Sequence, residues 1–218
     1  MSRIRLVAFD LDGTLLRGDT VCEVIARRLG LLERMRALEA TVKTRDEIAR
    51  AREEMVGWYG DRNVAELQEI ASQARLSPGA QEACASLIEA GVEITIASLT
   101  WDFAVERFAR ELRVGSWLGT LLRADGDIRH VWAESKAEWL VEKMEAADRS
   151  PAEVAAVGDS AGDVPLLNAV GLPVFVGKEA IAGLPERARH MPEADLRDVA
   201  ELILDESGLH ADCYFVGR

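Results

Sequence analysis

Short apolar runs alternate with helical patterns along most of the chain. Four apolar runs that end at turns or polar residues predict buried strands at 4–9, 92–97, 154–157 and 172–176. Apolar positions at helical spacing predict helices at 79–90, 103–112, 135–147 and 164–170. Strands that alternate with helices are typical of parallel βαβ units. We therefore predict an α/β fold with a three-layer, Rossmann-like core and a parallel sheet.

The stretch from about 19 to 75 breaks this alternation. It is rich in Arg, Glu and Ala and contains no convincing strand, which indicates a helical insert after the first strand. The turn sequence Ser77-Pro78-Gly79 marks the return to the alternating pattern. We predict a core made of residues 1–16 and 77–218, and a small helical cap made of residues 17–76.

The sequence pattern does not decide the structure of two other segments. Residues 118–133 contain the turn sequence Asp125-Gly126-Asp127, which predicts either a hairpin or an excursion at the sheet edge. In the tail, Cys213–Val216 fits a short edge strand or a disordered end, and its apolar residues could also serve self-association.

Composition narrows the class of protein. Of 218 residues, 49% are hydrophobic and 29% are charged, so a full core can form without disulfides. The net charge of −12 argues against nucleic acid or an anionic membrane as a partner. Cys22, Cys84 and Cys213 form no metal pattern and fit free thiols in a reducing compartment. No apolar run approaches the roughly 20 residues of a membrane span, and the N-terminus lacks a signal-peptide pattern, so we expect a cytoplasmic protein.

Polar side chains follow three of the predicted strands. Asp10 and Asp12 follow the first strand, Ser98 follows the second, and Asp159 follows the third, with Asp163 four residues later. Ligands of open parallel sheets bind beyond the carboxyl ends of the strands, where these side chains would meet. Lys136, at the start of a predicted helix, is the candidate cation for the same edge.

These residue types suit phosphoryl transfer. The Asp10 carboxylate can attack phosphorus and form an acyl phosphate that water then hydrolyses. Asp10 and Asp159 can bind Mg²⁺, which prefers carboxylate oxygens and offsets the charge of an anionic substrate. Asp12 can protonate the leaving alkoxide and later deprotonate water. Ser98 and Lys136 can donate hydrogen bonds to the phosphoryl oxygens.

Each of these features has a simpler explanation when taken alone. The Asp10–Thr14 stretch fits an acidic turn, and Ser98 fits a helix N-cap. Lys136 fits a solvated helix residue, and Gly158-Asp159-Ser160 fits a simple turn and cap. A scaffold that binds a partner without turnover is the corresponding alternative from another class. The order of the four features, each at a strand end or helix start, favours the enzyme.

The chain resembles the haloacid dehalogenase-like hydrolase superfamily. Residues 9–14 (FDLDGT) resemble its first motif, 96–98 (IAS) its second, Lys136 its third, and 158–163 (GDSAGD) its fourth. The resemblance spans about residues 5–178. It implies a Mg²⁺-dependent phosphomonoester hydrolase that works through an aspartyl-phosphate intermediate.

The resemblance also implies roles for individual residues. Asp10 becomes the nucleophile and a metal ligand, and Asp12 the general acid/base and a ligand through its backbone carbonyl. Ser98 and Lys136 hold the phosphoryl group. The remaining implied positions are Asp159, a metal ligand, and Asp163, in or near the outer shell of the metal. Family dehalogenases lack the second aspartate, so Asp12 favours phosphate-ester chemistry.

Within the superfamily, the insert is similar to the helical cap of the phosphoserine phosphatase group. There the cap places an acidic residue and an arginine on the amino and carboxylate groups of the substrate. Asp19, or alternatively Glu23, corresponds to the acidic residue, and Arg50 or Arg52 to the arginine. A charged helix face explains these residues equally well.

The segment after Ser98 departs from the group. The group usually has glycines there, whereas this chain has Leu99, Thr100 and Trp101. We expect Leu99 and Thr100 to contact the substrate and to shape a different pocket. The predicted substrate is therefore a small phosphorylated metabolite, with O-phosphoserine as the first candidate. Another phosphorylated metabolite, or phosphotransfer in place of hydrolysis, is the alternative.

Overall fold

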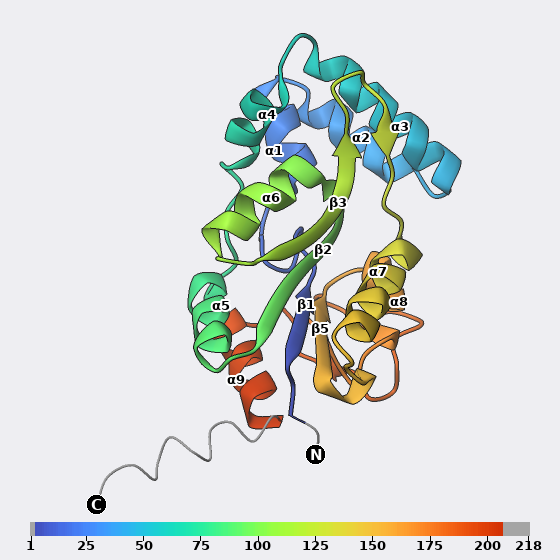
Figure 1. The fold of residues 1–218 in the computed structure, drawn as a ribbon. Helices are drawn as coiled ribbons and strands as arrows, with labels where there is room; N and C mark the ends of the chain where they lie inside the picture. Colours follow the sequence, from blue (N-terminus) through green and yellow to red (C-terminus); the bar gives the residue numbers. More distant parts are fainter. Residues whose placement is uncertain (1–2, 207–218) are drawn as a thin grey trace, which may run out of the picture.

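The computed structural model describes residues 3–206, which form a sheet covered by helices (Figure 1). The seven strands are β1 (Leu6–Phe9), β2 (Glu93–Trp101), β3 (Ser116–Leu122), β4 (Ile128–Arg129), β5 (Val154–Gly158), β6 (Leu172–Phe175) and β7 (Arg189–His190). Their order in the sheet is β4-β3-β2-β1-β5-β6-β7. All neighbours are parallel except β3 and β4, which form an antiparallel hairpin. The prediction of an α/β fold with a parallel sheet is confirmed.

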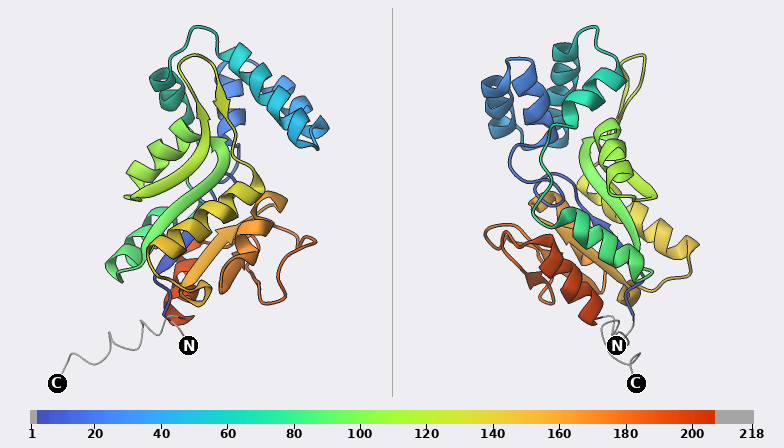
Figure 2. Two further views of the ribbon diagram at one scale, coloured as in Figure 1. Left: turned by 45° about the vertical axis from the view of Figure 1, so that its right-hand side comes forward. Right: turned by 90° about the vertical axis from the view of Figure 1, so that its left-hand side faces the viewer.

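Helices pack on both faces of this sheet, as the views in Figure 2 show. The core helices are α5 (Ala80–Glu89), α6 (Asp102–Glu111), α7 (Ala133–Ala146), α8 (Val164–Asn168) and α9 (Leu196–Glu206). Two short 3₁₀ turns, η1 (Pro151–Glu153) and η2 (Ala161–Asp163), flank β5. Helices α5 and α9 pack together, as do α7 and α8.

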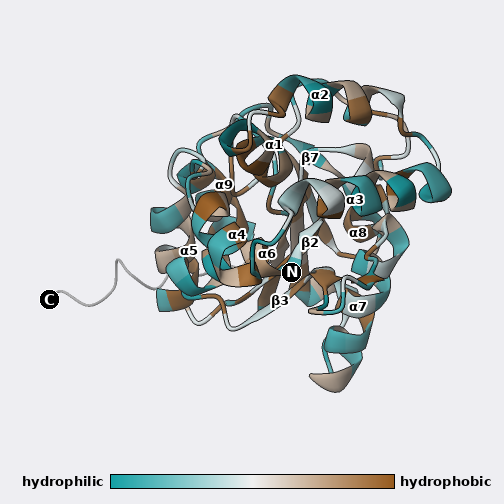
Figure 3. Ribbon diagram, turned by 90° about the horizontal axis from the view of Figure 1, so that it is seen from above, coloured by the Kyte–Doolittle hydropathy of each residue, from teal (hydrophilic) through white to brown (hydrophobic). Residues whose placement is uncertain are grey.

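The alternation of side chains along β1 explains the three layers. Val7 and Phe9 belong to one buried cluster with residues of α5 and α9, whereas Leu6 and Ala8 belong to the other with residues of α7 and α8. A strand buried on both faces is apolar throughout, as the run from Leu6 to Phe9 is. Hydrophobic segments, brown in Figure 3, gather around the central strands, and hydrophilic segments lie mainly on the surrounding helices.

The segment between β1 and α5 is helical and lies beyond the carboxyl end of the sheet (Figure 1). Its helices are α1 (Val21–Arg28), α2 (Leu32–Thr41), α3 (Arg45–Tyr59) and α4 (Val64–Ala71). Capping boxes that begin at Thr20, Thr44 and Asn63 start α1, α3 and α4, because each side chain accepts a hydrogen bond from an otherwise unpaired helix N–H.

The two ends of this segment lie side by side. The N–H of Arg17 donates to the carbonyl of Arg75 at 2.9 Å, and the N–H of Ser77 donates to the carbonyl of Leu15 at 2.8 Å. A segment whose ends are joined can be inserted without disturbing the sheet. The division into a cap of residues 17–76 and a core of residues 1–16 and 77–218 stays a prediction.

Several elements differ from the sequence-based expectation. The strand expected at 92–97 continues to Trp101, so Ser98 lies inside β2 and not after it. The 118–133 segment forms the β3–β4 hairpin, but β3 is also a full neighbour of β2. Helix α9 was not predicted. The ambiguous Cys213–Val216 segment lies outside the described residues. Within residues 3–206, no helix is both long and apolar enough to span a membrane.

Candidate active site

The first loop of the site follows β1. The N–H of Asp10 donates to the carbonyl of Val157 at 2.9 Å, which continues the sheet pairing up to the carboxylate. Gly13 has φ +83°, and a Cβ at this position would lie 2.2 Å from Oδ2 of Asp159. Only glycine permits this close approach without strain. The Thr14 hydroxyl donates to Oδ1 of Asp159 at 3.2 Å, so the first loop directly contacts the loop after β5.

The loop after β5 is organised by the buried carboxylate of Asp163. Its Oδ2 accepts hydrogen bonds from the N–H groups of Asp159 and Ser160, each at 3.0 Å, and from the Ser160 hydroxyl at 3.1 Å. Gly158 makes room for it, because a Cβ there would lie 2.5 Å from the Asp163 side chain. Asp163 therefore fixes the backbone that carries Asp159.

Lys136 connects the two loops. It lies in the first turn of α7 and is 1% exposed. Its ammonium donates to Oδ1 of Asp10 at 2.7 Å and also to Oδ1 of Asp163. Burial disfavours the ammonium, but the two carboxylates outweigh this effect and raise the pKa of Lys136. Asp10 and Asp163, which lie 126 and 27 positions from Lys136 in the sequence, thus share one buried cation.

A bulge in β2 carries Ser98, Leu99 and Thr100. Ala97 pairs with Leu118 and Trp101 with Thr120, so β2 has two extra residues between these pairs. Bulges re-aim side chains next to sites, which explains why a continuing strand can present polar groups at its edge. The Ser98 hydroxyl accepts a hydrogen bond from the N–H of Thr100 at 3.4 Å. The side chain of Leu99 packs over Gly162, where an added Cβ would lie 2.9 Å from Leu99 Cδ1.

Three carboxylates fit a metal ion. Asp10, Asp159 and Asp163 each offer an oxygen, and these oxygens lie within 4.8 Å of one another. Burial, together with the charges of Asp163 and Asp159, raises the pKa of Asp10 well above its usual range, against the opposing effect of Lys136. Burial and the charge of Asp163 raise the pKa of Asp159 to about 6. Excess negative charge of this kind suits a hard divalent cation, which binds carboxylate oxygens.

Asp12 has different surroundings from Asp10. Its Oδ1 accepts a hydrogen bond from the N–H of Val21 at 2.8 Å, at the N-terminus of α1. Burial raises the pKa of Asp12 to about 6, although this hydrogen bond and the Thr100 hydroxyl lower it. A carboxyl group with such a pKa can hold a proton and release it near neutral pH, as a general acid/base must.

The four charged cap residues predicted to bind substrate lie in different environments. Asp19 forms ion pairs with Arg27 and Arg36, and Glu23 closes the α1 capping box while it accepts from Arg36 at 2.9 Å. Arg50 is exposed on α3. None of these three lines the cavity next to Asp12.

Arg52 is the member of this set that reaches the core. It is 7% exposed, and its Nη2 donates to the carbonyl of Leu99 at 2.8 Å. Its Nη groups also contact the Val131 carbonyl at 3.3 and 3.4 Å and His130 Nδ1 at 3.1 Å. The guanidinium lies over the ring of Trp132, 5.2 Å from its centroid. Arg52 therefore joins α3 to the β2 bulge and to the segment before α7.

A cavity of about 200 Å³ lies beside Asp12, between the cap helices and the β2 bulge. Its polar lining includes Thr20, Cys22, Glu39 and Thr100 besides Asp12 and Arg52. Its apolar lining comes mainly from Met35, Leu38, Val42, Ile48, Met55 and Leu99. Sequence reasoning missed Glu39 and the cap residues of this apolar group. The spacing i, i+3, i+7 of 35, 38 and 42, repeated at 48, 51 and 55, is the signal that could have found them.

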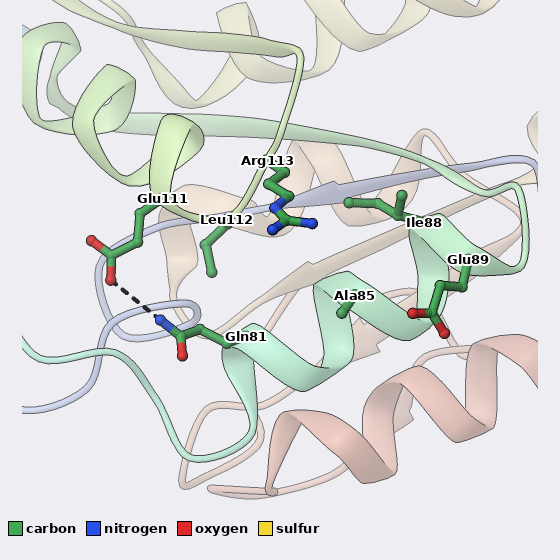
Figure 4. A pocket seen from close by; sticks show the side chains of 7 residues that line it. All are labelled: Gln81, Ala85, Ile88, Glu89, Glu111, Leu112 and Arg113. Carbon is green, nitrogen blue, oxygen red and sulfur yellow. Dashed lines mark hydrogen bonds between the residues drawn. The ribbon is translucent and has the colours of Figure 1, made fainter.

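A larger cleft lies away from this site. Its volume is about 380 Å³, and residues of α5 and of the end of α6 line it, as Figure 4 shows. Gln81 donates to Glu111 across it at 3.4 Å. None of the predicted site residues lines this cleft, and it lacks the acidic cluster. The larger cleft therefore lies apart from the predicted site, whereas Asp12, Arg52, Leu99 and Thr100 line the smaller cavity.

Comparison with known sequences identifies the family of the chain. The family model described as haloacid dehalogenase-like hydrolase matches residues 7–168. A phosphoserine phosphatase from Archaeoglobus fulgidus is 31% identical over 186 residues, which is 81% of this chain and 54% of that protein, so the chain spans about half of its length. A phosphoserine phosphatase from Halobacterium salinarum is 29% identical over 219 residues, 94% of this chain and 99% of its own.

Solved structures share the fold. A substrate-bound phosphoserine phosphatase complex superimposes with a TM-score of 0.76 at 21% identity, covering 93% of this chain and 99% of that one. A phosphoserine phosphatase in apo form gives 0.74 at 21% identity, over 91% and 98% of the two chains. The predictions of a Rossmann-like hydrolase fold and of a phosphatase are confirmed. The chain belongs to the haloacid dehalogenase-like hydrolase family, within its phosphoserine phosphatase-like group.

Proposed function

We propose that the protein hydrolyses a small phosphomonoester in a Mg²⁺-dependent reaction through an aspartyl phosphate on Asp10. The observation that carries this proposal is the buried Lys136 ammonium, which lies between Asp10 and Asp163 next to three carboxylates suited to a cation. An anionic nucleophile can approach an anionic phosphate only where positive charge offsets the repulsion. O-phosphoserine is the first substrate to test, because the relatives carry that name.

In the first step an Asp10 carboxylate oxygen attacks phosphorus and the bond to the ester oxygen breaks. Asp12, whose pKa is about 6, gives its proton to the leaving alkoxide. The Lys136 ammonium and the Ser98 hydroxyl donate to the phosphoryl oxygens, where the transition state spreads its charge.

In the second step water attacks the acyl phosphate on Asp10. Asp12, now deprotonated, accepts the proton of this water, and the bond between phosphorus and Asp10 breaks. The products are the free alcohol and inorganic phosphate, and both carboxyl groups return to their starting states. Asp10 and Asp159, with the backbone carbonyl of Asp12 and with Asp163 in or near the outer shell, would hold Mg²⁺. When bound, Mg²⁺ supplies positive charge to the phosphoryl oxygens.

Turnover of 4-nitrophenyl phosphate, with and without Mg²⁺, tests the proposal against an Asp10→Asn control. We expect Mg²⁺-dependent turnover only in the wild type. Wild-type protein quenched during turnover should also carry phosphate that hydroxylamine releases, as it does from acyl phosphates, and Asp10→Asn should not. Equal turnover by both proteins would refute the role of Asp10. We also propose a cytoplasmic location, which the free thiols Cys22 and Cys84 support.

A further inference from the structure

The cavity beside Asp12 is where the alcohol portion of the substrate must lie. Asp12 gives its proton to the ester oxygen in the proposed reaction, so the rest of the alcohol extends from that carboxyl group. Asp12 and Thr100 both line the cavity of about 200 Å³, and most of the remaining lining is apolar. This cavity is the space next to the proposed proton donor, and side chains of α2 and α3 line its far side.

No free cation lines this cavity among the described residues. Arg52 is its one cationic lining residue in the 3–206 range, and its Nη groups already contact two backbone carbonyls and His130. Lys136 does not line the cavity, and its ammonium forms ion pairs with Asp10 and Asp163. A carboxylate on the alcohol portion would therefore have to displace one of these contacts of Arg52 or remain unpaired in a largely apolar space, and either is costly.

The rim of the cavity carries a carboxyl group. Glu39 lines it, and the structure gives this residue no hydrogen bond or salt bridge within residues 3–206. Burial and the charges of Glu23 and Asp12 raise the pKa of Glu39 to about 7, against the opposing charge of Arg36, so this end of the cavity offers a substrate carboxylate an acidic group and no free cation. A second carboxylate in the same place would be repelled.

We propose that the substrate is a phosphomonoester whose alcohol portion is apolar and carries no carboxylate. This inference rests on the phosphomonoesterase function proposed above and specifies its substrate class. Burial of one methylene group is worth about 0.8 kcal/mol, which corresponds to about a fourfold change in kcat/KM. The cavity should therefore distinguish substrates mainly by their apolar length.

The test compares kcat/KM for ethyl, butyl and hexyl phosphate with that for O-phosphoserine, at saturating Mg²⁺. The three alkyl alcohols are leaving groups of nearly equal acidity, so differences within this series report on the cavity and not on the chemical step. We expect kcat/KM to rise about fourfold per methylene and hexyl phosphate to exceed O-phosphoserine by at least tenfold.

Paired variants locate the effect. Val42 lines the cavity and is half-buried, whereas Val64 is 40% exposed on α4 and does not line it. Val42→Asp should flatten the chain-length dependence, and Val64→Asp should leave it unchanged. The thermal unfolding of both variants checks that each is folded before its kinetics are compared.

The outcomes separate this inference from the proposed function. A flat wild-type series, or O-phosphoserine above hexyl phosphate, would overturn the apolar substrate class while Mg²⁺-dependent turnover of 4-nitrophenyl phosphate still supports the phosphatase. An unchanged slope in folded Val42→Asp would also overturn it. Absence of turnover with every ester would instead refute the proposed function, and with it this inference.

Discussion

The ammonium nitrogen of Lys136 lies 2.7 Å from Oδ1 of Asp10, and both side chains are almost completely buried. The same ammonium also donates to Asp163, so one cation holds two carboxylates from the segments that follow β1 and β5. Removal of one partner of such a buried pair leaves an uncompensated charge. The relationship therefore links the stability of the site to its chemistry.

Lys136→Met should reduce kcat for 4-nitrophenyl phosphate by about 100- to 1,000-fold, because a preorganised donor to the phosphoryl oxygens is lost. The free energy of unfolding of this variant should also be lower by about 3–5 kcal/mol at pH 7, because Asp10 and Asp163 lose their shared cation. Steady-state kinetics and urea unfolding measure the two effects.

Lys143→Met is the matched control for this variant. Lys143 lies on the same helix, with its ammonium 4.9 Å from the centroid of the Trp139 ring and no carboxylate partner in the described ion pairs. The Lys143→Met variant should keep kcat within about twofold of the wild-type value. A Lys136→Met protein with normal kcat would show that this ammonium is not needed for turnover.

Gly13→Ala should weaken Mg²⁺ binding. The new methyl group would lie 2.2 Å from Oδ2 of Asp159 and must displace that carboxylate. Displacement of a ligand or its support typically costs about 10- to 100-fold in metal affinity. Calorimetric titration with Mg²⁺ measures this loss independently of turnover.

Gly126→Ala separates backbone strain from the contact with Asp159. Gly126 has φ +88°, close to the +83° of Gly13, but a Cβ there would meet nothing within 4 Å. Both variants should lose about 1 kcal/mol or more of stability from the positive φ. Equal Mg²⁺ affinity in the two variants would disprove the steric explanation.

The metal-free protein should lose stability as pH rises from about 4 to about 6.5. The pKa of Asp159 is about 6 in the folded state, against an ordinary value near 3.8, so the folded state binds more protons between these values. Its contribution is fully present below about pH 4 and is lost as pH rises through about 6. Thermal unfolding in EDTA should show this trend, and Mg²⁺ should oppose it because the metal binds the deprotonated carboxylates.

Asp159→Asn should reduce this pH dependence by about 1–3 kcal/mol over the same range. Asp61→Asn changes an exposed carboxylate and should leave the dependence as it is in the wild type. An identical pH profile for Asp159→Asn and wild type would contradict the assignment of the titration to this carboxylate.

Arg52→Lys should lower kcat/KM for small and large esters alike, by about tenfold. A lysine cannot hold the carbonyls of Leu99 and Val131 together as the guanidinium does, so the β2 bulge next to Ser98 should shift. Kinetics with ethyl and hexyl phosphate measure kcat/KM for a small and a large ester. The exposed Arg50, changed to Lys, is the control and should behave as wild type. A loss confined to the larger ester would instead indicate direct substrate recognition.

Much of the fold follows from local pattern. The four apolar runs and the helices between them are short-range features, and each buried strand is apolar on both faces because helices cover the sheet on both sides. β3 was only partly predicted, because Gly119 and the neighbouring hairpin turn obscure its pattern. The continuation of β2 through Ser98 was missed because a bulge depends on pairing with β3 and not on local propensity.

The sequence by itself determined the chemical set: Asp10, Asp12, Lys136, Asp159 and the helical character of the insert. Their order and residue types carry that information without coordinates. Only the tertiary structure decided which side chains meet. It placed Lys136 between Asp10 and Asp163, tied Asp19 to Arg27, and brought Glu39 to the cavity beside Asp12. These contacts join residues 8 to 126 positions apart and depend on how the elements pack together, and helix spacing alone cannot specify which neighbour a charged side chain finds.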